Sequence, residues 1–177
     1  MKKLSLDELN RLSVDEFKLA VKNSIVVVLD NVRSMNNIGS VFRTCDAFLA
    51  ERVFLCGITA TPPHKDIYKT ALGATDSVDW QYFETTEQAI HKLKQENYFI
   101  VAVEQAEGSI PLNKFMPNRS TKYALVFGHE VNGVQQSIVD MADCCLEIPQ
   151  EGTKHSINIS VSAGIVLWDF FAKLKNS

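Results

Sequence analysis

The stretch Ile25-Val26-Val27-Val28-Leu29 is a continuous run of apolar, mostly β-branched residues that ends at Asp30-Asn31. A run without polar alternation is typical of a strand covered on both faces, as in a parallel sheet. A polar loop follows, and then apolar residues at helical spacing between about residues 39 and 48, with Asn36 and Asn37 as candidate caps. The segment therefore predicts a strand, a loop and a helix, which is the repeating unit of an α/β fold.

Strand-like and helix-like segments alternate along the rest of the chain. Two capping boxes, Ser5 with Glu8 and Ser13 with Glu16, predict two short opening helices. We expect one α/β domain over residues 25–177, with a mainly parallel sheet and helices on both faces, preceded by an N-terminal helical extension over residues 1–24. Further strands are predicted at 53–56, 78–83, 98–103, 123–127 and 144–148, and further helices at 66–72, 86–95 and 158–174.

The composition is that of a folded domain in water. The 177 residues are 46% hydrophobic and 22% charged, and the basic start turns acidic before a signal-peptide core could form. No apolar stretch reaches the length needed to cross a bilayer, so no membrane association is expected. The net charge of −3 argues against a protein that coats nucleic acid by bulk electrostatics, although a local basic patch remains open.

The cysteines and histidines lack the spacing of metal ligands. We expect reduced, structural thiols in a cytoplasmic compartment, because adjacent cysteines in an apolar run indicate buried side chains rather than a bridge. A metal site is not predicted. The residues concerned are Cys45, Cys56, Cys144, Cys145, His64, His91, His129 and His155.

Three segments far apart in the chain combine glycine with hydrogen-bonding side chains directly after an apolar strand-like run. They are residues 37–43, 128–133 and 148–158. Open α/β sheets bind ligands at the carboxyl ends of their strands, and glycine allows a ligand to approach the backbone closely. The sequence therefore predicts a composite site and an enzyme.

The first segment has two interpretations. Asn37 caps a helix, Gly39 opens its first turn and Arg43 lies four residues later on the same face, so free backbone amides and a forked cation could bind a phosphate. The alternative is a plain capped helix whose arginine pairs with a surface acid. The segment alone does not choose between them.

The second and third segments are equally ambiguous when taken singly. Gly128 and Gly133 bracket Glu130, which is compatible with a simple glycine turn around a solvated glutamate, and the spacing is not a dinucleotide fingerprint. Ser156 and Asn158 stand where the last helix begins, so helix capping would explain them. A nucleophilic serine is not favoured, because no Gly-x-Ser-x-Gly elbow is present.

In combination, the segments resemble the three motifs of the SpoU (TrmH-like) RNA 2'-O-ribose methyltransferases of the SPOUT superfamily, over roughly residues 25–174. The resemblance implies transfer of a methyl group from S-adenosylmethionine to an RNA ribose; the sequence does not decide between tRNA and rRNA, and we expect tRNA, with rRNA as the alternative. It also implies a parallel-sheet α/β knot, with a deep C-terminal trefoil knot, and a homodimer that builds the site jointly. The matching stretches are Asn37-x-Gly39-x-x-x-Arg43, Gly128-x-Glu130-x-x-Gly133 and Ile148-Pro149-x-x-Gly152-x-x-x-Ser156-x-Asn158.

The resemblance also implies roles for ten residues. Arg43 would bind and orient the RNA phosphate first, because a guanidinium with a pKa above about 12 is a poor base. The alternatives left open are a non-catalytic knotted RNA-binding module and a flavodoxin-like nucleotide-binding domain. The implied catalytic residues are Arg43, Asn37, Glu130, Ser156 and Asn158, and the implied cofactor-binding positions are Val103, Glu104, Gly128, Ile148 and Ile157.

Overall fold

The computed structural model describes residues 1–5 and 7–176, and a parallel sheet forms the centre of the fold. Over these residues the sheet has seven strands in the order β3-β2-β1-β6-β4-β7-β5, and every strand pair is parallel. The strands are β1 (Asn23–Asp30), β2 (Ala50–Cys56), β3 (Asp79–Phe83), β4 (Tyr98–Val103), β5 (Ile110–Pro111), β6 (Lys122–Phe127) and β7 (Cys144–Glu147).

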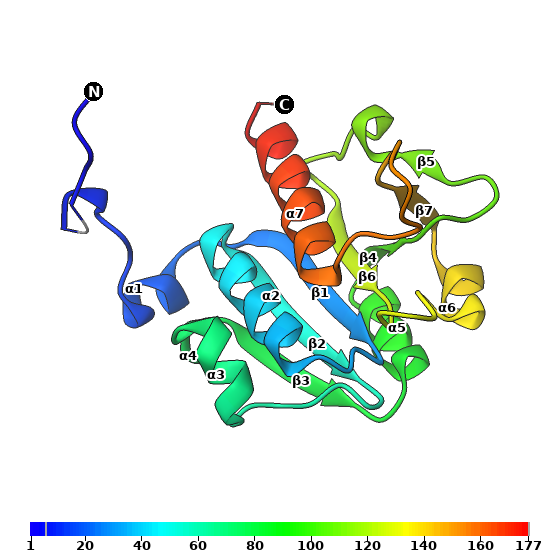
Figure 1. Ribbon diagram of the computed structural model, residues 1–177, viewed down its shortest axis with the longest axis horizontal. Helices are drawn as coiled ribbons and strands as arrows, with labels where there is room; N and C mark the ends of the chain where they lie inside the picture. The colour runs from blue at the N-terminus through cyan, green and yellow to red at the C-terminus, as the bar shows by residue number, and fades with distance from the viewer. Residues whose placement is uncertain (6, 177) are drawn as a thin grey trace.

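Helices cover both faces of the sheet, as the alternation of elements predicts. Successive residues of β1 point to opposite faces, so Val27 and Leu29 join one core cluster while Val26 and Val28 join the other. One cluster is closed by helices α2 (Met35–Ala47), α3 (Lys65–Ala71) and α7 (Ile159–Asn176), and the other by α5 (Thr86–Gln95) and α6 (Gln136–Met141). Figure 1 shows α2 and α7, which contact each other, side by side across one face.

The prediction of a doubly covered strand at residues 25–29 is confirmed, because every residue of β1 from Ile25 to Asp30 is buried. Full burial of each valine or leucine side chain contributes about 1.5 to 3 kcal/mol. The run therefore forms a fully buried interior strand of the sheet. None of the helices in the described part of the chain is long and apolar enough to span a membrane.

The opening segment is less helical than its two capping boxes suggest. The box at Ser13 and Glu16 caps α1 (Val14–Leu19) in full. Ser5 and Glu8 exchange the same pair of hydrogen bonds, yet only a short 3-10 helix, Asp7–Leu9, forms there. Figure 1 shows the segment before α1 running away from the sheet, and short isolated helices are marginally stable in water.

The predicted start of the helix at residues 39–48 is wrong. Helix α2 begins at Met35, and its cap is Ser34, whose hydroxyl accepts a hydrogen bond from the Asn37 amide at 3.3 Å. Gly39 consequently lies inside the helix, where a Cβ atom would stand 2.2 Å from the carbonyl oxygen of Ile67. Close packing of α2 on α3, rather than approach of a ligand, explains this glycine.

The remaining differences concern short elements. Helix α4 (Ala74–Ser77), helix α6, strand β5 and the 3-10 helix Leu112–Lys114 were not predicted, because pieces of two to six residues carry too little periodicity. The other predicted strands and helices are present, with ends that differ by up to three residues. Of the missed elements, β5 is an edge strand, while α4 and α6 contribute Ala74 and Ile138 to the two core clusters.

All four cysteines are free thiols. Burial raises the pKa of Cys56 to about 12 and that of Cys144 to about 11. Thiols with such pKa values stay protonated near neutral pH and are poor nucleophiles. Their environments are therefore those of structural cysteines.

Candidate functional site

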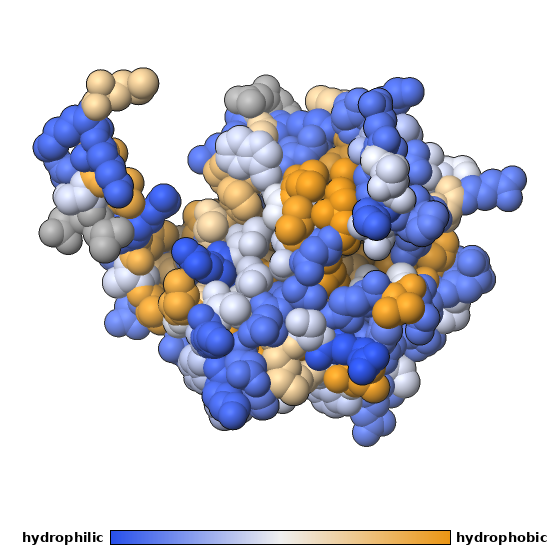
Figure 2. Space-filling model, viewed as in Figure 1, coloured by the Kyte–Doolittle hydropathy of each residue, from blue (hydrophilic) through white to orange (hydrophobic). Residues whose placement is uncertain are grey.

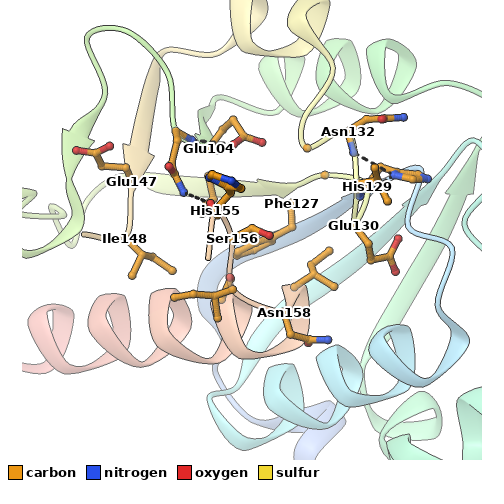
Figure 3. Close-up of a pocket in the computed structure, with 18 of the residues that line it drawn as sticks. Glu104, Phe127, His129, Glu130, Asn132, Glu147, Ile148, His155, Ser156 and Asn158 are labelled. Atoms are coloured by element: carbon orange, nitrogen blue, oxygen red, sulfur yellow. Dashed lines mark hydrogen bonds between the residues drawn. The ribbon is translucent and has the colours of Figure 1, made fainter. Parts of the chain in front are cut away.

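A cavity of about 490 Å³ opens at the carboxyl edge of β4, β6 and β7. Its walls are the residues that follow these strands, together with the first turn of α7, as Figure 3 shows. The carboxyl ends of parallel strands are where α/β proteins bind ligands, and the volume is typical of a small-molecule site. The cavity is therefore the candidate site.

Eight of the ten residues implied by the sequence line this cavity. The two that do not are Asn37, which is hydrogen-bonded to lining residues, and Arg43. Polar side chains of Gln105, Gln150 and His155 also line it, and their loops carry no spacing signal that could have identified them. The eight lining residues are Val103, Glu104, Gly128, Glu130, Ile148, Ser156, Ile157 and Asn158.

Glu130 joins the second segment to the start of α2. Its carboxylate accepts hydrogen bonds from the backbone N–H groups of Arg33 at 3.0 Å and Ser34 at 2.9 Å, and from the side-chain amide of Asn37 at 3.2 Å. The interpretation of Glu130 as a solvated side chain of a plain turn is therefore wrong. The Glu130 carboxylate therefore accepts hydrogen bonds from the backbone amides just before α2, at the place where the sequence suggested that a phosphate would bind.

Asn158 joins the third segment to the same place. Its side-chain N–H donates to the Asn37 side-chain oxygen at 3.2 Å, and its own oxygen accepts from the Ser160 amide at 2.9 Å. Asn158 thus caps α7 and also lines the cavity. The chain of contacts Glu130–Asn37–Asn158 links all three segments, and in Figure 3 both Glu130 and Asn158 lie on the side of the cavity toward α2.

Arg43 stands apart from this network. It is exposed on α2 and is not part of the cavity wall, and its guanidinium forms no hydrogen bond or ion pair with any residue in the described part of the chain. The interpretation in which it pairs with a surface acid of its own chain is therefore wrong. Its guanidinium is left available to a ligand or to another molecule.

The loop from Gly128 to Val134 closes tightly on itself. His129 and Gly133 exchange two backbone hydrogen bonds, and Glu104 accepts from the Val134 amide at 2.9 Å. A Cβ atom on Gly128 would lie 2.0 Å from the carbonyl carbon of Gly133, whose own φ of +68° favours glycine. The loop geometry therefore requires both glycines.

We expect Gly128→Ala to open this loop. Overpacking against backbone atoms should destabilise the protein by about 2 to 3 kcal/mol and weaken ligand binding at least about tenfold. Urea unfolding and calorimetry would measure the two effects. Gly164→Ala is the control, because a Cβ there meets no atom within 4 Å and alanine favours a helix by about 0.5 to 1 kcal/mol, so it should stabilise the protein. Equal stability of the two variants would contradict this prediction.

The surroundings of the Glu130 carboxylate determine the direction in which its pKa is shifted. Burial alone would raise the pKa, but the hydrogen bonds from the backbone of Arg33 and Ser34 and from Asn37 outweigh it, so the pKa lies below the ordinary value of 4.5. A lowered pKa in the folded state stabilises the protein fully above the unfolded pKa. This contribution is lost as the pH falls through the folded pKa.

A comparison with Glu130→Gln tests this linkage. At pH 7 the wild-type protein should be more stable by about 1 kcal/mol, because charge-assisted hydrogen bonds exceed those to a neutral amide. Lowering the pH to about 3 should shrink the difference toward zero. Denaturant titrations at both pH values provide the measurement, and a difference independent of pH would show that the carboxylate charge has no such effect.

The fold and the cavity together define an α/β protein with a cavity of small-molecule size at the carboxyl edge of a parallel sheet. The chain belongs to the SpoU rRNA Methylase family, whose family model matches residues 24–168. That match covers β1 through most of α7 and therefore includes the whole cavity.

Relatives and solved structures agree with this assignment. The chain is 30% identical over 148 residues to the 23S rRNA (guanosine-2'-O-)-methyltransferase RlmB of Nitrosomonas europaea, covering 84% of this chain and 56% of that protein. It is 29% identical over 154 residues to the tRNA (guanosine(18)-2'-O)-methyltransferase of Aquifex aeolicus, covering 84% and 69%. The crystal structure of an AdoMet-bound rRNA methyltransferase from Sinorhizobium meliloti superposes with a TM-score of 0.79 at 26% identity, covering 87% and 59%. The chain spans 56% to 66% of the length of several curated relatives.

Proposed function

We propose that this protein is an S-adenosylmethionine-dependent RNA 2'-O-ribose methyltransferase that acts on tRNA, with rRNA as the second candidate substrate. The observation that carries the proposal is the hydrogen-bonded chain Glu130–Asn37–Asn158, which unites the three family segments beside one cavity. Membership of the family and the named activities of relatives on tRNA and 23S rRNA support it.

The cavity suits S-adenosylmethionine. Apolar Phe127, Ile148 and Ile157 offer surfaces for a planar base, while the backbone near Val103, Glu104 and Gly128 offers hydrogen-bonding groups at the strand ends, with no side chain on Gly128 to block approach. When bound, this cofactor supplies a methyl group activated by its positively charged sulfur. The residues of the chain then have to hold the acceptor sugar in line with that methyl group and exclude water.

Arg43 is the proposed substrate-orienting residue. Its exposed, unpaired guanidinium can bind an RNA phosphate with two parallel hydrogen bonds and so fix the ribose 2'-hydroxyl. The start of α2 is held in place by hydrogen bonds among Asn37, Glu130 and Asn158. These contacts thereby fix the orientation of the helix that carries Arg43. Ser156, on the cavity wall, lies where it can hydrogen-bond to the substrate or accept a proton in transit.

We also propose a homodimer in which Arg43 completes the site of the partner. Helix α7 buries one side in the core, while Val161, Ile165 and Trp168 on the other side are 50%, 36% and 57% exposed. Positions four and three residues apart form one stripe on a helix, and such an apolar stripe is typical of an interface. Figure 2 shows apolar side chains gathered over and beside α7.

The deep C-terminal trefoil knot is likewise a proposal, supported by the order of the strands. Strand β7 lies between β4 and β5, both earlier in the chain, and α7 then returns to pack on α2. We further propose that residues 25–177 form the methyltransferase domain, that residues 1–24 are an extension of it, and that the protein works in the cytoplasm. The free cysteines support a reducing compartment.

Methyl-labelled S-adenosylmethionine incubated with the protein and separate tRNA and rRNA pools tests the function. The expected result is label in tRNA that nuclease digestion places on a ribose 2'-oxygen. Heat-denatured protein is the control for background methylation. RNA binding without incorporation would favour a non-catalytic module, and binding of FMN in place of S-adenosylhomocysteine, measured by calorimetry, would favour a flavodoxin-like domain.

A further inference from the structure

Asp30 is a buried carboxylate that the cavity does not use. Its side chain is 0% exposed, it does not line the cavity, and it forms no ion pair with the described residues. Burying a charge without a partner is strongly unfavourable unless hydrogen bonds replace its water. Asp30 accepts four: from the Asn31 side chain at 2.9 Å, the Thr86 hydroxyl at 2.6 Å, and the backbone and side-chain N–H groups of Gln135 at 3.0 and 2.8 Å.

The two hydrogen bonds from Gln135 place Asp30 opposite Glu130. Residues 30–34 leave β1, and residues 130–135 form the loop after β6, so these two segments belong to neighbouring strands. Asp30, in residues 30–34, accepts hydrogen bonds from Gln135, and Glu130, in residues 130–135, accepts hydrogen bonds from Arg33 and Ser34. Two carboxylates pointing in opposite directions therefore tie the same two segments together.

We propose that Asp30 is a positioning residue that sets the loop from Gly128 to Val134 against the start of α2. By holding Gln135, it fixes the end of the loop so that Glu130 meets the amides of Arg33 and Ser34. Helix α2 carries Asn37 and Arg43, so Asp30 acts on the site through Glu130 and touches neither cofactor nor RNA. Its role in catalysis depends on the proposed methyltransferase function, whereas its effect on the loop does not.

Hydrogen exchange in the free protein tests the positioning directly. Asp30→Asn leaves only one acceptor oxygen for four donors, so the amides of Arg33, Ser34 and Gln135 should exchange at least about tenfold faster, as in a locally opened segment. The matched control is Asp143→Asn, which alters a carboxylate that accepts from the Ile100 amide at 2.6 Å, at the amino edge of the sheet. The control should leave exchange at Arg33 and Ser34 unchanged. Unchanged exchange in folded Asp30→Asn would overturn the proposal.

Kinetics separate positioning from a general loss of fold. Asp30→Asn should lower kcat about tenfold and leave the KM for S-adenosylmethionine within about twofold, with Asp143→Asn normal in both. Adding Gln135→Glu to Asp30→Asn restores a carboxylate–amide pair and should recover part of kcat.

If Asp30→Asn does not fold, Gln135→Ala is the substitute. This change is at an exposed residue and keeps the backbone hydrogen bond to Asp30, so it should show the same pattern more weakly. Normal exchange and normal kcat in Gln135→Ala would then overturn the proposal.

The two tests fail separately. A wild-type protein that transfers no methyl group would contradict the proposed function, while the exchange comparison would still decide the role of Asp30. Conversely, an active enzyme in which Asp30→Asn changes neither exchange nor kcat would leave the proposed function intact and remove the positioning role.

Discussion

Arg43→Lys is expected to lower turnover about a hundredfold while leaving the affinity for S-adenosylhomocysteine within about twofold. A lysine keeps the charge but loses the planar fork that binds a phosphate through two hydrogen bonds, so the ribose would no longer be held in line with the methyl group. Arg43 lies outside the cavity wall, which is why cofactor binding should be unaffected. Single-turnover methylation and calorimetry give the two quantities.

Lys94→Ala is the control for this prediction. Lys94 is exposed on α5, on the opposite face of the sheet, so the variant removes a whole positive charge away from the site. Its turnover should stay within about twofold of the wild type, because a distant surface charge is screened by salt. Full turnover and unchanged RNA affinity in Arg43→Lys would refute the orienting role of Arg43.

Trp168→Glu is expected to produce a monomer whose turnover is at least about a hundredfold lower. Trp168 ends the exposed apolar stripe on α7 and also packs against Phe48 and Phe171, with ring centroids 5.8 and 5.9 Å away. A buried, unpaired carboxylate in each half of a two-fold interface would oppose association. Separation from its partner would also leave each cavity without the Arg43 that the dimer is proposed to supply.

Trp80→Glu is the matched control, since Trp80 is 38% exposed on the edge strand β3. It should remain dimeric and active. Sedimentation of the wild type and both variants reports the oligomeric state, and circular dichroism confirms that they are folded. A wild-type monomer with full activity would contradict the joint site, and an active dimer of Trp168→Glu would contradict the proposed interface at α7.

The sheet could be predicted because each of its long strands has a recognisable local sequence pattern. The run at residues 25–29 is apolar throughout, and only a strand covered on both faces accounts for it. The start of α2 could not be predicted, because Ser34, Asn36 and Asn37 are all good caps. Glu130, almost a hundred residues away in the chain, holds the amides of Arg33 and Ser34 and so favours the earlier start.

The site shows the same division between local and long-range information. Glycine and polar residues directly after strands predicted the loops that line the cavity. Gly39, in contrast, is required by the close packing of α2 on α3, which no local sequence pattern reveals. In the sequence Asp30 only marks the end of the apolar run, and the role that we propose for it rests on Gln135, which is remote in sequence. The position of Arg43 outside its own cavity depends on the whole path of α2 and, in our proposal, on a second chain.

A crystal structure with S-adenosylhomocysteine tests the central claim, that three distant segments build one site for methyl transfer, most directly. The account predicts the ligand in the cavity between the loops after β4, β6 and β7, with Arg43 of the partner subunit facing it across a two-fold axis. A ligand bound elsewhere, or Arg43 remote from the cavities of both protomers, would contradict it.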